Sequence, residues 1–192
     1  MNPAMRAKAM LADPSAEWAR IERESGDPAY LLSRYVAVLA LLPPLFGFIG
    51  ACFVGAIMPG TGLLRASWFD GAFGAIFLYM ESVIAILVLA FIIDIVAPLF
   101  GGKKDFDAAL KLAVYSFTPV WLAGIFLLLP GLHFLVLTAF YGVYVLAAGL
   151  PRLMKTPKAQ SPLYITLAAA CALGLIVGAV IAQRTIFPAS GI

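Results

Sequence analysis

Two carboxylic acids, Glu81 and Asp94, lie inside one long apolar run of the chain. Ionisable side chains within a bilayer usually face the interior of a helix bundle or a water-filled cavity. Along a helix the two acids are about 20 Å apart, so their carboxyls cannot share a proton or a metal ion. Their positions predict a proton or cation site, or the polar lining of a cavity. The alternative is that each protonated carboxyl joins neighbouring helices by a hydrogen bond.

Polar residues of other apolar runs are expected at similar depths. Asp94 should lie level with Tyr115, Ser116 and Thr118, and Glu81 should lie level with Tyr141. Asp94 is also near the basic residues after its helix, which favours a structural ion pair or cap. The candidate polar site comprises Glu81, Asp94, Tyr115, Thr118, Pro119 and Tyr141.

Prolines and glycines mark where the helices should bend or approach closely. Pro43 and Pro44 interrupt the first apolar run, and Pro119 lies within the third. Pro119 removes a backbone donor, so it predicts a static kink or a hinge, with the hydroxyls of Ser116 and Thr118 satisfying the freed carbonyls. Glycines at four-residue and eight-residue spacing predict close helix packing, either within one bundle or in a homodimer. These glycines are Gly47 and Gly55 in the first apolar run, and Gly174 and Gly178 in the last.

Composition places these residues in a membrane protein. Of 192 residues, 63% are hydrophobic and 12% are charged, whereas a soluble domain is usually near half apolar and a quarter charged. The net charge of +3 is too small to indicate nucleic-acid binding. Two cysteines and one histidine make no metal motif, and no phosphate-binding or nucleophile motif is present. We therefore expect no catalytic residues, no metal and no cofactor.

The apolar runs predict an all-α fold with five transmembrane helices, because a crossing needs about 20 apolar residues. The expected spans are 36–58, 72–100, 112–129, 133–150 and 163–182. We divide the chain into an N-terminal segment (residues 1–34), a five-helix transmembrane domain (35–186) and a short extracytoplasmic tail (187–192).

The N-terminal segment predicts a short amphipathic helix from Ser15 to about Glu24. Leu11, Trp18 and Ile21 fall roughly on one face of it. The helix is expected to lie on the membrane surface with Trp18 among the lipid head groups. The alternative is a solvated helix that packs Trp18 on the protein's own loops.

Positive charge in short loops predicts the orientation. Eleven basic residues fall on the side of the N-terminus, and Arg65 and Arg184 fall on the other side. The N-terminus is therefore expected in the cytoplasm and the C-terminus outside. Five basic residues of the cytoplasmic loops are expected to bind membrane lipids, anionic ones in particular. They are Lys103, Lys104, Arg152, Lys155 and Lys158.

Several short motifs follow one another in a characteristic order. They include Trp18-x-x-Ile21, Tyr79-x-Glu81 and Phe100-Gly101-Gly102, and the longest, LAVYSFTPVWLAGI, runs from Leu112 to Ile125. Together they resemble the bacterial branch of the Yip membrane proteins, which are named for interacting with Ypt/Rab GTPases. The resemblance implies a five-helix bundle with a cytoplasmic N-terminus in a bacterial inner membrane, and no catalytic residues. About 34 N-terminal residues leave little room for a GTPase-binding domain, so that eukaryotic role is not carried over.

Two functions remain open from the sequence. The first is a non-catalytic membrane protein that organises or binds partners, which could include a second copy or another membrane protein. The second is a small transporter or channel that uses Glu81 and Asp94 and bends at Pro119. A hydrated cavity that reaches Glu81 would favour the second.

Overall fold

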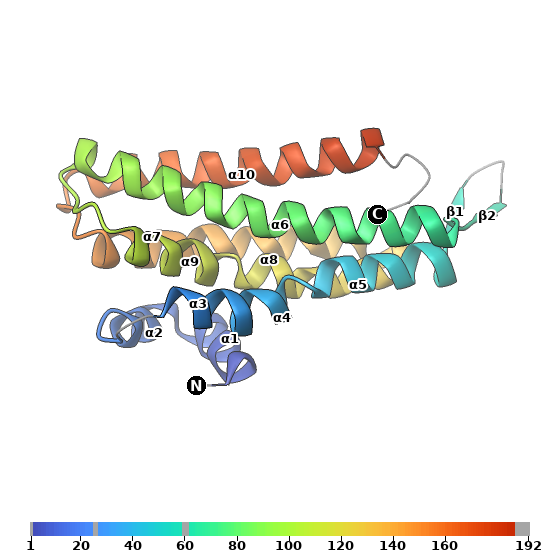
Figure 1. Ribbon diagram of the computed structural model, residues 1–192, viewed down its shortest axis with the longest axis horizontal. Coiled ribbons are helices and arrows are strands. Elements are labelled where there is room, and N and C mark those ends of the chain that lie inside the picture. The colour runs from blue at the N-terminus through green and yellow to red at the C-terminus, as the bar shows by residue number, and fades with distance from the viewer. Residues whose placement is uncertain (1, 25–26, 59–61, 187–192) are drawn as a thin grey trace.

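The computed structural model describes residues 2–24, 27–58 and 62–186. Within them, five helical segments are long and apolar enough to cross a membrane, which confirms the predicted fold class. The five lie along one long axis, and two further helices near the N-terminus lie beside them (Figure 1). The spans are Pro28–Val54, Trp68–Phe100, Phe106–Leu128, Gly131–Leu153 and Ser161–Ile186. The predicted tail, residues 187–192, lies outside the described residues.

The first span starts earlier and ends earlier than predicted. Its helix begins at Pro28, where the side chain of Asp27 accepts a hydrogen bond from the amide of Ala29 at 2.9 Å. The predicted start was wrong because polar residues before Val36 interrupt the apolar run without interrupting the helix. The elements in order are α3 (Pro28–Tyr30), a π-helix (Leu31–Val36), α4 (Ala37–Leu39), α5 (Leu42–Ile49) and a second π-helix (Gly50–Val54).

Two prolines interrupt this span, as expected. Pro43 and Pro44 lie in the first turn of α5, where their missing amide hydrogens cost no helical hydrogen bond. The helix ends at Val54 rather than Met58, because Gly55 has a φ of +73° that turns the chain. Two strands follow, β1 (Ala56–Met58) and β2 (Gly62–Leu64), and they form an antiparallel pair.

The second span is one long helix, α6 (Trp68–Val96), continued by a 3-10 turn (Ala97–Phe100). Ser67 caps its start, since the Ser67 hydroxyl accepts from the amide of Asp70 at 3.1 Å. Gly101 ends it with a φ of +66°. The second span therefore ends at Phe100, as predicted.

The third span breaks where the sequence predicts a kink. It consists of α7 (Phe106–Ser116), α8 (Thr118–Ala123) and a 3-10 helix (Gly124–Leu128), with Pro119 in the first turn of α8. The fourth span begins with a 3-10 helix (Pro130–Phe140) and continues as α9 (Tyr141–Leu153). The fifth is α10 (Ser161–Ile186).

The third span is the most enclosed of the five. Helix α6 packs against α5, α7 and α10, and α7 packs against α9 (Figure 1). Fully buried apolar side chains gather where the second half of α6, α7, the second half of α9 and the start of α10 meet. We call this part the loop end, because it carries the segments 101–105 and 154–160.

The glycines at which two helical spans approach most closely are not the predicted ones. A Cβ on Gly124 would lie 2.6 Å from the Cα of Pro43, and a Cβ on Gly50 would collide with the carbonyl oxygen of Leu127. A Cβ on Gly174 or Gly178 would meet no atom of the described residues within 4 Å. Of the two alternatives for this stripe, packing within the described bundle is therefore not observed. Of the first-span stripe, Gly47 is buried, and Gly55 serves the turn before β1.

The N-terminal segment holds two helices rather than one, α1 (Pro3–Ala12) and α2 (Pro14–Ile21). Asp13 separates them and caps α2, because its side chain accepts from the amide of Ala16 at 3.0 Å. The predicted helix to Glu24 was three residues too long, and α1 was missed. The pair folds back on the bundle, where α2 contacts α9 and α1 contacts α8 (Figure 1).

Candidate functional site

Trp18 joins the N-terminal segment to the bundle. Its side chain is 0% exposed, and its indole Nε1 donates a hydrogen bond to the carbonyl of Val145 in α9 at 2.9 Å. Gly149, one turn later, leaves room for the ring, since a Cβ there would collide with the indole. The expectation that Trp18 lies among lipid head groups was therefore wrong. The alternative of packing on loops was also wrong, because Trp18 packs on a helix of the bundle.

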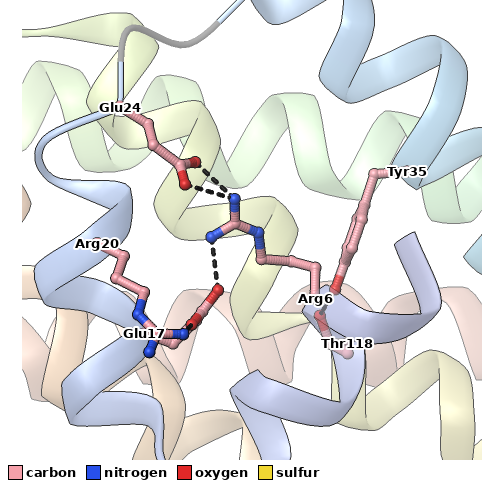
Figure 2. Close-up of polar contacts among 6 residues, drawn as sticks. All are labelled: Arg6, Glu17, Arg20, Glu24, Tyr35 and Thr118. Atoms are coloured by element: carbon pink, nitrogen blue, oxygen red, sulfur yellow. Dashed lines mark hydrogen bonds and ion pairs between the residues drawn. The ribbon is translucent and has the colours of Figure 1, made fainter. Parts of the chain in front are cut away.

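A buried ion pair joins α1 to α2 (Figure 2). Arg6 Nη1 donates to Glu17 Oε1 at 2.5 Å, and Nη2 donates to Glu24 Oε2 at 2.6 Å. The side chains of Arg6 and Glu17 are 7% and 2% exposed. Burial alone would lower the pKa of Arg6, but hydrogen bonds and attraction from Glu24 and Glu17 raise it above its ordinary value. The guanidinium is therefore held in its charged form.

An aromatic cluster from the bundle completes this contact. The Arg6 guanidinium carbon lies 5.7 Å from the ring centroid of Tyr115, which is within range of a cation–π interaction. Tyr115 meets Trp18 and Tyr35 edge to face, with centroids 6.0 Å and 4.9 Å apart. The hydroxyls of Tyr35 and Thr118 are 2.8 Å apart, and either one can donate (Figure 2). We call these seven residues the docking interface: Arg6, Glu17, Trp18, Glu24, Tyr35, Tyr115 and Thr118.

Basic residues of the loop end hold the same segment from outside. Lys155 forms an ion pair with Glu22, and this contact lowers the pKa of Glu22. Arg152 donates to the carbonyl of Ser15 at 3.2 Å, and Lys111 donates to the carbonyl of Glu24 at 2.7 Å. Arg152 and Lys155 were predicted as lipid-binding residues, and the structure places them against the protein's own N-terminal segment.

Three of the predicted lipid-binding residues remain exposed. Lys103, Lys104 and Lys158 lie at the surface, and none forms an ion pair with another described residue. We call them the basic surface. Lys103 lies near the N-terminal segment, since its amide donates to the carbonyl of Met154, one residue before the Lys155 that pairs with Glu22.

The six residues of the predicted polar site do not gather in one place. Tyr115 and Thr118 belong to the docking interface, and Pro119 begins α8 next to them. Tyr141 donates to the carbonyl of Leu11 in α1 at 3.1 Å, rather than to Glu81. The Ser116 hydroxyl has no hydrogen-bond partner among the described residues, and that of Thr118 pairs with Tyr35, so neither is seen to satisfy the carbonyls freed by Pro119.

Glu81 and Asp94 remain apart from the docking interface, both in α6. Asp94 is 5% exposed, and Glu81 is half-buried. One oxygen of each, Glu81 Oε2 and Asp94 Oδ1, is enclosed without a hydrogen-bond partner among the described residues. The ion pair expected for Asp94 is not formed there. The described residues also contain no group of three or more His, Cys, Asp or Glu that could hold a metal ion.

Sequence reasoning missed four members of the docking interface. Arg6, Glu17 and Glu24 are charged residues of a segment that holds many, and their spacing carries no signal that they meet. Tyr35 lies at the start of an apolar run, where an aromatic residue is ordinary. The one indication in the sequence is that Glu17 lies next to Trp18 on the same helix. Burial of Trp18 against the bundle encloses Glu17 as well.

Comparison with known proteins agrees with the five-span fold. The family model of the Yip1 domain matches residues 8–181 of this chain. The inner membrane protein YohC of Escherichia coli K12 is 24% identical over 155 residues, which cover 79% of this chain and 80% of that protein. The protein of the same name from Escherichia coli O6:H1 matches to the same extent. No solved structure gives a significant match. The chain therefore belongs to the Yip1 domain family and is a membrane protein.

Proposed function

We propose that this chain is a non-catalytic organising protein of a bacterial cytoplasmic membrane, which binds its partners through the loop end. One observation carries the proposal: the N-terminal segment is docked on the bundle, next to the basic surface. The amide of Lys103 donates to the carbonyl of Met154, and the next residue, Lys155, pairs with Glu22 of the docked segment. Exposed lysines beside the docked segment suit an acidic protein partner.

The proposed orientation places this face in the cytoplasm. The positive-inside pattern of the loops supports it, as does the name of the relative, an inner membrane protein. The C-terminus would then lie outside. A homodimer through the open Gly174 and Gly178 stripe of α10 remains a prediction, because those positions face no part of the chain's own bundle.

Site-specific photo-crosslinking in cells tests the proposed partner face. A photoreactive residue at Lys103 should give a discrete protein adduct, and the substitutions Lys104→Glu and Lys158→Glu should abolish it by reversing the charge. The matched control is the same photoreactive residue at Val180, which is exposed on α10. An absent adduct at 103, or the same adduct from both positions, would contradict the proposal.

A transporter is the second candidate, and it is favoured by the unpartnered oxygens of Glu81 and Asp94. Buried carboxyls without partners are costly in a bilayer and are often functional. Against it, a path would need polar groups that join the two acids, whereas Tyr115 and Tyr141 bind the N-terminal segment instead.

Thiol labelling separates these two functions. In a chain with Cys52→Ala and Cys171→Ala, a cysteine placed at Glu81 should react slowly with a small charged thiol reagent if the bundle is dry. The organising function predicts this slow reaction. The reference rate is that of Cys171 in a chain that carries only the Cys52→Ala substitution. Rapid labelling at position 81 would show water at that depth, and the transporter would then lead.

A further inference from the structure

A cavity of about 390 Å³ lies between the N-terminal segment, the start of the first span and α7. This volume is within the range of pockets that bind small molecules, about 300–1,000 Å³. The cavity is open to solvent on the side of Arg23 and Asp27, and Tyr35 and Tyr115 of the docking interface line it as well. It contains none of the basic surface.

Charged side chains of both signs line the cavity in equal number. Arg6, Arg23 and Lys111 are cationic, and Glu24, Asp27 and Asp107 are anionic. The balance disfavours a purely anionic ligand, because any phosphate that approached the cations would also face the acids. A ligand that carries both charges meets partners for each.

Most of these charges remain available. Arg6 is occupied by Glu17 and Glu24, but Lys111 uses one of its three ammonium hydrogens on a carbonyl. Arg23 and Asp107 form no ion pair with another described residue. The cavity thus offers a cationic pair, Arg23 and Lys111, and a carboxylate, Asp107.

The spacing on α7 sets the two kinds of charge side by side. Asp107 and Lys111 are four residues apart, so they lie on one face of the helix about 6 Å apart along its axis. They do not form an ion pair with each other, and both face the cavity. A head group whose ammonium and phosphate are joined by a short linker can contact both at once.

The surface next to the cavity suits acyl chains. Tyr30 and Leu31 line the cavity at the start of the first span. Val38, Leu41 and Leu45 follow along that span, and they are 54%, 49% and 43% exposed. An apolar strip that begins at a charged cavity at the end of a membrane span is the arrangement that a phospholipid requires.

We infer that this cavity binds a zwitterionic head group with a primary ammonium, the phosphoethanolamine group of a phospholipid. Lys111 and Arg23 hold the phosphodiester, and Asp107 accepts hydrogen bonds from the ammonium. A quaternary ammonium has no N–H to donate, so phosphatidylcholine should bind less well. The inference does not depend on the proposed partner face, which uses other residues.

Native mass spectrometry of the full-length protein tests the inference. The protein in detergent receives equal amounts of phosphatidylethanolamine, phosphatidylglycerol and phosphatidylcholine. Phosphatidylethanolamine should be retained about tenfold more than either competitor, which corresponds to the loss of one charge-assisted hydrogen bond. Glycerophosphoethanolamine, added as a soluble competitor, distinguishes a free ligand from a lipid, since it displaces the lipid at equal concentration only if the acyl chains contribute nothing.

Variants show whether the cavity is responsible. Asp107→Asn and Lys111→Met should each weaken retention of phosphatidylethanolamine about tenfold. Lys8→Met, which changes an exposed lysine of α1 outside the cavity, is the matched control and should match the wild type. Because Lys111 also contacts Glu24, Asp107→Asn is decisive: it leaves every hydrogen bond of the N-terminal segment in place. Equal retention of the three lipids, or no change in Asp107→Asn, would overturn the inference.

Discussion

Arg6 and Glu17 are buried together, so removing one of them leaves the other without its buried partner. A buried ion pair is not by itself evidence of stability, because desolvation can cost as much as the attraction returns. Breaking such a pair is costly, however. Breaking this pair should weaken the contact between the N-terminal segment and the bundle, because the Arg6 guanidinium also contacts Tyr115 of the bundle. Arg20 contacts the same Glu17 from the surface, at 3.2 Å with 68% of its side chain exposed.

This contrast gives a matched pair of variants at the residue scale. Arg6→Ala should destabilise docking of the N-terminal segment by about 3–5 kcal/mol, because Glu17 is left without its buried partner. Arg20→Ala should cost less than about 1 kcal/mol, as exposed pairs do. Hydrogen exchange of residues 3–22 measures both, and the exchange of α7 reports whether the bundle itself remains folded.

Hydrogen exchange should distinguish the two variants clearly. Fast exchange through α1 and α2 in Arg6→Ala, with wild-type exchange in Arg20→Ala, is the expected result. Equal protection in the two variants would mean that the buried pair does not hold the segment.

At the scale of elements, the first and third spans approach most closely. Gly124 lies against Pro43, and Gly50 lies against the backbone of Leu127. The last apolar run carries a GxxxG pattern, but no described residue packs on Gly174 or Gly178. Spacing identifies a surface of small residues, yet it does not say whether that surface faces a neighbour or the lipid.

Substitutions of these glycines should therefore differ. Gly124→Ala adds a methyl group where there is no room, and it should destabilise the bundle by about 1–3 kcal/mol and lower the midpoint of thermal unfolding. Gly174→Ala adds the same group in open space and should leave the midpoint unchanged. Thermal unfolding of both variants in one detergent, followed by circular dichroism, checks this. A lower midpoint for Gly174→Ala in monomeric protein would be contrary to the account.

The elements themselves could largely be predicted from the sequence. Apolar length specified five spans, and proline chemistry located the breaks at Pro43 and Pro119, because both signals are local. The polar partners were not local. Tyr141 is separated from Leu11 by 130 residues and Tyr35 from Thr118 by 83, so no periodicity or spacing could identify these contacts.

At the scale of the whole molecule, the N-terminal segment is part of the packed structure. Its composition differs from that of the spans, and on that basis it was expected to be separate, with Trp18 in the lipid. One tryptophan and one arginine suffice to reverse that expectation, because each finds a buried partner on the bundle or the adjacent helix. Two of the loop cations then contact the segment.

The most direct test of this account is a crosslink between the segment and the loop end. In a chain with Cys52→Ala and Cys171→Ala, Glu22→Cys and Lys155→Cys should be joined rapidly by a short bifunctional thiol reagent in native membranes, since Glu22 and Lys155 form an ion pair. Peptide mass spectrometry identifies the product, and Glu22→Cys with Arg184→Cys at the far end is the control. A high yield for 22–155 alone is predicted. A yield no greater than that of the control would contradict the docked N-terminal segment and the partner face built on it.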